Sequence, residues 1–370
     1  MRIALIITIG IHGIIHLLGF LKAFNLYEFN GISQPISEPF GIMWLLACIL
    51  FIISSFLILI NSNYWWITGI VGVILSQFLI LNYWSDAKFG TIVNIIVLVA
   101  ILLTYSAFMF KKKVNAEAVK MFENSVETEK SIVTKQMIQN LPTIVQKWLV
   151  SSGTVGKEII YNIYLEQDLQ MLMKPEQKDW NNGKAKQYFT TKSPAFNWSV
   201  NLKVNSLLNI VGRDKFENGK GEMIIKLFSL FSMANTKNNE KINQAALQRY
   251  LAEIVWFPSF ALSPYITWET IDEKSTKATM KYKETKGSGI FCFDENGTFK
   301  KFIAMRYKDV NDTKATEWKV TATKTEERNG IKIPVELTAE WKLKNSSWTW
   351  LKVKITDIKY NVQKMPIADE

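Results

Sequence analysis

Long apolar runs dominate the first 110 residues of the chain. Four of them lie at residues 3–21, 41–60, 64–83 and 89–110. Each is about 20 residues long, which is the length that a helix needs to cross a hydrocarbon core of about 30 Å. None shows the polar face, repeated every 3.6 residues, that marks a helix on a soluble protein. The pattern predicts four transmembrane helices.

The two histidines of the chain, His12 and His16, both fall in the first run. Because they are four residues apart, they share one face of a helix. Ionisable groups at membrane depth are rare, and one interpretation is a metal, haem or quinone site, or a proton-handling pair. The other is hydrogen bonding between helices that pack closely at Gly10, Gly13 and Gly19. The sequence leaves both open.

Beyond residue 150 the period of the pattern changes from 3.6 to 2. Between residues 331 and 343 apolar positions alternate with polar ones, which predicts a long strand with one apolar face. Pro334 donates no ladder hydrogen bond, so this part of the strand is an edge or a bulge. In the last strand the apolar phase switches between Ile355 and Ile358, which predicts a bulge near Asp357.

Asn-Gly pairs separate several of the strand-like runs. They begin at Asn182, Asn218, Asn296 and Asn329 and predict tight hairpins. Counting runs from residue 159 to 362 gives about ten or eleven strands, interrupted by one helix near residues 243–255. So large a sheet with one apolar face must curl or be covered. We therefore predict a helical transmembrane bundle followed by an α+β soluble domain, a curled antiparallel half-barrel with covering helices.

The same patterns set the expected domain boundaries. Residues 1–110 form the membrane region, 111–134 a charged and partly helical linker, and 135–370 the half-barrel domain. This domain begins with a predicted amphipathic helix at 135–150, in which Pro142 marks a first-turn position or a kink.

The helix that interrupts the strands carries the candidate site. Arg249 and Glu253 are four residues apart on it and can pair, and Trp256 follows. One interpretation makes Glu253 a polar anchor at a cavity mouth, with Arg249 setting its charge and Trp256 forming a wall. The other is a surface ion pair beside a core tryptophan.

Charge is concentrated in the C-terminal part. The first 110 residues hold three basic and three acidic side chains, so the formal charge of +11 belongs to the rest. A basic domain is attracted to anionic lipid at about 1 kcal/mol per Lys or Arg near the surface. The lysines alternate with acidic and apolar residues, so nucleic acid is not an expected partner. Lys111, Lys112 and Lys113 follow the fourth run, and with Arg2 they place both termini on the cytoplasmic side.

Several classes of chemistry are excluded by composition. With no histidine outside the first run, Ser-His-Asp, Cys-His and soluble histidine–metal sites are excluded. The phosphate-binding GxxxxGK[ST] motif is absent, and no motif identifies a cofactor. Catalysis by carboxylates alone, for instance Glu253 with Glu269, stays open. Cys48 and Cys292 fall in a predicted membrane helix and a predicted strand, so no disulfide is expected.

Five segments carry a family resemblance: RYLAEIVWFP, ITWE, FCFDENGTFKKFIAMRY, GIKIPVELTAEW and ITDIKYN. With IHLLGF in the first run, they resemble an uncharacterised bacterial family of unknown function with N-terminal membrane spans. The resemblance covers residues 141–361 and the first span. It implies a soluble domain similar to the outer-membrane lipoprotein carrier superfamily, a curled sheet with a helical lid that holds acyl chains, and a bacterial inner-membrane location.

The expected function is a non-enzymatic, membrane-anchored binder of a lipid, acyl chain or other hydrophobic molecule. The residues expected to contact it are Arg249, Tyr250, Glu253, Trp256 and Trp268. The first alternative is a membrane-tethered scaffold for a protein partner that the sequence does not identify. The second is a redox or transport role centred on His12 and His16.

Overall fold

The structure, a computed structural model, describes residues 2–27, 31–123, 125, 130–205 and 208–366. Three parts of the sequence-based description lie outside the described residues: Glu28, one of the three acidic residues of the first 110, part of the expected linker, and the last four residues of the expected half-barrel domain. The chain divides into two compact units, with the boundary between Lys111 and Lys112. The division into functional domains at residues 110 and 135 stays a prediction.

The first unit is helical. Its elements are α1 (Arg2–Ala23), α2 (Glu38–Leu59), α3 (Trp65–Asn82), the short α4 (Trp84–Ala87) and the first part of α5 (Gly90–Glu123). Among the described residues four helices are long and apolar enough to cross a membrane, as the sequence predicted. Glycine allows α1 and α2 to approach closely, since a Cβ at Gly19 would lie 2.4 Å from the ring of Trp44.

Helix α5 continues well past the predicted end of the fourth span. Its last turns belong to the second unit, where Ala118 and Phe122 are buried against Tyr164 and Tyr188 of the sheet. The first half of the expected linker is therefore helical and packed. Spacing of four residues puts these small and aromatic side chains on one face of the helix.

The helix expected at 135–150 is two helices, α6 (Lys135–Ile138) and α7 (Thr143–Ser151). Pro142 is the N-cap of α7, with an extended ψ of 141°. Because proline disfavours the helical conformation in the residue before it, the chain leaves the helix there and starts a new one.

Thirteen strands form one antiparallel sheet among the described residues, more than the ten or eleven expected. They are β1 (Asn162–Met171), β2 (Asn181–Thr190), β3 (Ala195–Lys203), β4 (Asn209–Glu217), β5 (Lys220–Leu227), β6 (Phe231–Lys237), β7 (Ile266–Thr270), β8 (Ser275–Tyr282), β9 (Thr285–Phe293), β10 (Phe299–Arg306), β11 (Thr316–Arg328), β12 (Ile331–Lys342) and β13 (Ser347–Tyr360).

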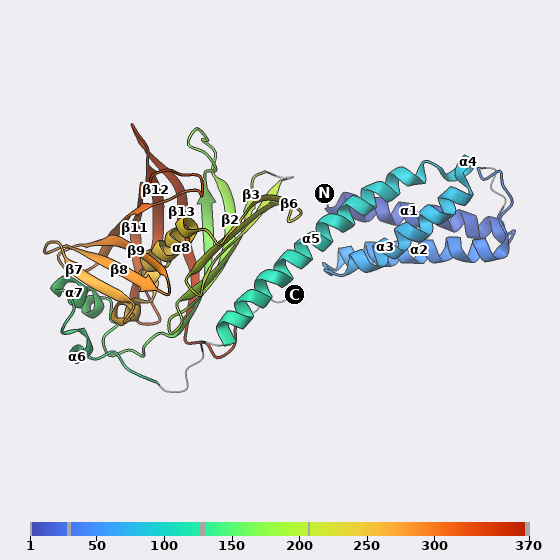
Figure 1. The fold of residues 1–370 in the computed structure, drawn as a ribbon. Helices are drawn as coiled ribbons and strands as arrows, with labels where there is room; N and C mark the ends of the chain where they lie inside the picture. The colour runs from blue at the N-terminus through green and yellow to red at the C-terminus, as the bar shows by residue number, and fades with distance from the viewer. Residues whose placement is uncertain (1, 28–30, 124, 126–129, 206–207, 367–370) are drawn as a thin grey trace. The chain divides into compact units, whose positions relative to one another are not determined.

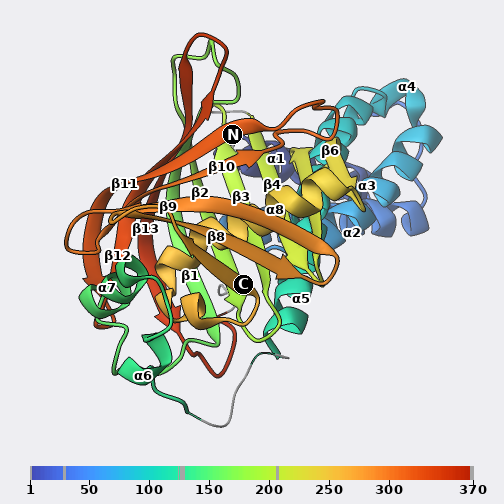
Figure 2. The same ribbon diagram turned by 60° about the vertical axis from the view of Figure 1, so that its left-hand side comes forward.

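The sheet consists of two meanders joined in the middle. Strands β1 to β6 follow one another to one edge, β7 to β13 run inward from the other edge, and β1 pairs with β13. Helix α8 (Glu240–Glu253), with the 3₁₀ turns η1 (Ile254–Trp256) and η2 (Pro258–Leu262), connects the two edge strands. It contacts β4 and β5 on one arm and β8, β9 and β10 on the other. The sheet thus curls around α8, which gives the predicted half-barrel (Figures 1 and 2).

Turn and bulge predictions were right at most positions. Asn218 and Asn329 begin two-residue hairpin turns and have positive φ angles of 53°, and Asn296 lies in the loop between β9 and β10. The turn predicted at Asn182 was wrong, because Asn182 lies inside β2 and pairs with Gln170 and Lys203. The ladder between β1 and β13 shifts next to Asp357, as predicted.

Pro334 lies at a register shift between β11 and β12, so the bulge interpretation was right. Strand β12 is interior to the sheet. However, its pairing with β13 begins only at Glu336. Pro334, which has no N–H to donate, therefore lies outside the β12–β13 ladder and costs it no hydrogen bond.

Candidate functional site

A cavity lies on the concave face of the curled sheet, beneath α8. Its volume is about 220 Å³. Most of its lining is apolar and comes from β1, β3, β4, β5, β11, β12 and β13. These side chains include Leu169, Met171, Val200, Leu202, Ile210, Met223, Val320, Leu337, Leu351 and Val353. The apolar face that the period-two pattern predicted is thus only partly filled by protein side chains.

Helix α8 brings Arg249 and Glu253 to this cavity. The Nε of Arg249 donates to Glu253 Oε1 at 2.9 Å, and its Nη1 donates to Asp214 Oδ2 of β4 at 2.7 Å. The guanidinium also lies 4.6 Å from the ring centre of Trp198. Both side chains of the helical pair are largely buried, at 14% and 13% exposed. The interpretation as a surface ion pair is therefore excluded by its burial.

A chain of buried amides extends this pair across the sheet. Gln187 Nε2 donates to Glu253 Oε2 at 2.8 Å, and Gln167 Nε2 donates to Gln187 Oε1 at 3.2 Å. Trp198 Nε1 completes the chain by donating to Gln167 Oε1 at 2.8 Å. Each acceptor is satisfied by a donor from a neighbouring element, so the polar patch has one defined arrangement.

Burial and charge act in opposite directions on Glu253. Removal from water raises the pKa of its carboxyl above the ordinary value, and Asp214 adds to this rise. Arg249 and Gln187 oppose it by attraction and hydrogen bonding. The two carboxylates together hold the pKa of Arg249 above its ordinary value despite burial.

Trp256 lines the cavity, and its Nε1 donates to the carbonyl of Pro334 at 3.0 Å. The structure therefore brings Arg249, Glu253 and Trp256 together at one cavity. Their role in contacting a ligand stays a prediction.

Tyr250 and Trp268 are not among the residues that line the cavity. Tyr250 is fully buried, and its hydroxyl donates to the Thr190 carbonyl at 2.8 Å. Trp268 lies on the edge strand β7 and donates from Nε1 to the Ala261 carbonyl at 3.0 Å. In this structure both pack within the core.

Four polar residues of the site were missed by the sequence analysis: Gln167, Gln187, Asp214 and Arg306. A signal for them exists in the sequence. Each stands at an apolar-phase position of its strand, as Arg306 does after Phe302 and Ala304. Polar residues that interrupt an inward-facing series are buried and need partners.

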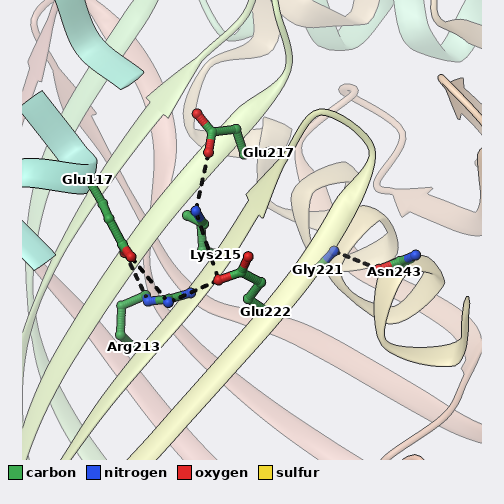
Figure 3. A network of polar contacts seen from close by, with 7 residues as sticks. All are labelled: Glu117, Arg213, Lys215, Glu217, Gly221, Glu222 and Asn243. Carbon is green, nitrogen blue, oxygen red and sulfur yellow. Dashed lines mark hydrogen bonds and ion pairs between the residues drawn. The ribbon is translucent and has the colours of Figure 1, made fainter. Parts of the chain in front are cut away.

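A second polar cluster lies on the opposite face of the sheet (Figure 3). Arg213 of β4, 1% exposed, forms ion pairs with Glu117 of α5 at 3.1 Å and with Glu222 of β5 at 3.1 Å. Lys215 contacts Glu217 at 3.2 Å and Glu222 at 3.9 Å. The cluster thus attaches the end of α5 to β4 and β5, and Gly221 donates its N–H to Asn243, which attaches β5 to α8.

A family model with the description "Family of unknown function (DUF6920)" matches residues 139–360. The chain belongs to this family. The family resemblance predicted from the sequence is thereby confirmed. The match covers α7, all thirteen strands and α8, so the cavity lies within the DUF6920 region.

Comparison of the DUF6920 chain with curated proteins gave no match. Among solved structures, it is similar to a LolA superfamily protein from Nitrosomonas europaea at 10% identity and a TM-score of 0.34, covering 63% of this chain and 96% of that one. A beta-barrel-like protein of a domain of unknown function, DUF1849, from Brucella abortus is similar at 9% identity and a TM-score of 0.26. That match covers 54% of this chain and 98% of the other.

The histidine pair of this DUF6920 protein is part of a hydrogen-bonded network within the helical unit. His16 Nδ1 donates to the His12 carbonyl at 2.7 Å, and its Nε2 lies 2.8 Å from the Ser76 hydroxyl. His12 Nε2 lies 3.0 Å from Asn94 Oδ1, and Asn94 also bonds Ser76. The network joins α1, α3 and α5. Among the described residues no group of three His, Cys, Asp or Glu side chains is placed to hold a metal ion.

Proposed function

We propose that this chain is a membrane-anchored protein that binds a lipid or another apolar molecule in the cavity of its second compact unit, the sheet unit. The observation that carries the proposal is the cavity itself, about 220 Å³ and lined mostly by aliphatic, Met and Trp side chains. An engineered apolar cavity of about 150 Å³ suffices to bind benzene. Pockets for small molecules are typically apolar with a few fixed polar groups, which describes this lining.

The polar groups of the site support binding with a defined orientation. Arg249, Glu253 and the glutamine chain are fixed by hydrogen bonds at one side of the cavity. Apolar side chains of β12 and β13 lie elsewhere in the lining. A ligand with one polar and one apolar end would match this division.

We also propose that the protein resides in the bacterial inner membrane with the sheet unit in the cytoplasm. The support is the number of apolar helices and the three lysines at 111–113, directly after the last span.

Native mass spectrometry of the full-length chain, released from nanodiscs, tests the binding proposal. Val353 of β13 lines the cavity. Its neighbour Lys354 faces outward and is the control position. We expect Val353→Phe to lose a co-purifying apolar molecule that the wild type carries, because the larger phenylalanine side chain occupies part of the cavity. Lys354→Phe should keep it. Equal retention by both variants would contradict binding in the cavity.

A further inference from the structure

The cavity contains a second arginine whose environment differs from that of Arg249. Arg306 is the last residue of β10 and lies on the same face as Phe302 and Ala304, both buried. It is among the residues that line the cavity. A guanidinium in such a lining is always charged and has five N–H donors to satisfy.

Protein acceptors satisfy only part of the hydrogen-bonding capacity of this guanidinium. Its Nε donates to the Ala245 carbonyl of α8 at 3.0 Å. Its carbon lies 4.6 Å from the ring centre of Trp318 and 5.8 Å from that of Trp341. These contacts fix the plane of the group and leave the Nη1 and Nη2 donors without a protein acceptor among the described residues.

The two other arginines near the cavity are balanced by direct contacts. Arg249 contacts Asp214 and Glu253, and Arg213 contacts Glu117 and Glu222 on the other face of the sheet. Among the described residues no carboxylate lies within 4 Å of Arg306. The cavity therefore offers one oriented, partly desolvated cation beside an apolar volume.

We propose that Arg306 binds the anionic head group of an amphiphile whose alkyl chain occupies the apolar part of the cavity. This inference rests on the proposed function and specifies its ligand class. The fork of Nη donors matches the two oxygens of a carboxylate or a phosphate, the geometry in which arginine binds such groups most strongly. The ring of Trp318 covers one side of the guanidinium and leaves the fork edge for the ligand.

The electrostatics agree with this geometry. Burial lowers the pKa of Arg306 to about 10, while the more distant Asp214 and Glu253 raise it and Arg249 lowers it further. The positive charge is thus held at a cost among the apolar side chains of the lining. A bound anion would offset this cost, whereas a neutral head group would not.

Photolabelling of the full-length chain in phosphatidylcholine nanodiscs tests the inference. The probes are a twelve-carbon diazirine carboxylic acid, the corresponding alcohol and the corresponding alkyl phosphate. Peptide mapping measures the labelling of β1, β3 and β11–β13. Labelling of α1–α3 serves as an internal reference for the amount of each probe in the bilayer, so differences in partitioning cancel.

For the wild type we expect the acid or the phosphate to label the cavity strands about tenfold more than the alcohol, the factor that a charge-assisted hydrogen bond supplies. Arg306→Gln should lower this preference to about one while the alcohol labels as before, which also shows that the cavity has kept its shape. Arg306→Lys keeps the charge but lacks the planar fork, and it should retain only part of the preference. Arg328→Gln removes an exposed arginine that pairs with Glu326, and it should change nothing.

The outcomes separate the inference from the proposed function. Equal labelling of the wild-type cavity by acid, phosphate and alcohol would overturn the role of Arg306 and leave apolar binding intact. A preference unchanged in Arg306→Gln would do the same. Cavity strands that no probe labels would contradict the proposed function itself. A higher yield with the phosphate than with the acid would support a phospholipid-like head group, and the reverse a fatty acid.

Discussion

Arg249 is held between two carboxylates from different elements, and at the residue scale it is the polar centre of the cavity. Its removal by Arg249→Met would leave Asp214 and Glu253 largely buried without a cation. We expect a loss of about 3–5 kcal/mol in the free energy of unfolding, the usual effect of removing one partner from a buried ion pair. Denaturant titration of the full-length protein measures it. The triple variant Arg249→Met, Asp214→Asn and Glu253→Gln is the control and should recover part of the loss.

Glu253 supplies a pH dependence whose sign follows from its raised pKa. The folded state binds the proton more tightly than the unfolded state, so this group's contribution to stability falls as the pH rises through the folded pKa. We expect the unfolding temperature of the wild type, relative to Glu253→Gln, to fall as the pH rises from the ordinary glutamate pKa upward. A difference that grows with pH would show that the attraction of Arg249 outweighs burial.

The inward-facing apolar positions of the sheet were predictable from the sequence, because alternation with period two needs only local information. Arg249, Glu253 and Trp256 were recognised as a group because helical spacing puts them near one another. Gln187 and Asp214 were not, since their partners come from other strands. Which strands face α8 depends on the curl of the whole sheet.

At the scale of elements, the contact between α8 and β5 sets how closely the sheet wraps its helix. A Cβ at Gly221 would lie 2.6 Å from the Ile242 carbonyl oxygen and 2.9 Å from the Ala246 Cβ. We expect Gly221→Ala to push α8 from β5 and to cost about 1–3 kcal/mol, the range for overpacking. The control Lys220→Ala changes an exposed neighbour on the same strand. Thermal unfolding of both variants checks this, and equal midpoints would contradict so tight a contact.

Element types were easier to predict than element ends. The four apolar helices and the hairpins at Asn218 and Asn329 were right because each follows from a short-range rule. Asn182 has the same dipeptide but lies in β2, since the connection that precedes it already reverses the chain. Helix α5 ran past its predicted end because the sheet buries Ala118 and Phe122, a tertiary effect that no local pattern contains.

At the scale of the whole molecule, the proposed orientation in the membrane can be tested with single cysteines in a chain whose Cys48 and Cys292 are replaced by serine. Lys184 is exposed on the sheet unit, and Gly31 lies in the connection between α1 and α2. We expect a membrane-impermeant maleimide to label Gly31→Cys in intact cells. Lys184→Cys should react only after the membrane is permeabilised. The opposite pattern would contradict a cytoplasmic sheet unit.

The pairing of β1 with β13 has a consequence for biosynthesis. The two strands at the middle of the sheet come from opposite ends of the unit, so on the ribosome β1 must wait for nearly the entire unit to be translated. Until then the first meander presents an unpaired strand edge, a template for wrong pairing between nascent chains. A premature stop before residue 347 would leave that edge open for good, and such a product should be prone to aggregation and proteolysis.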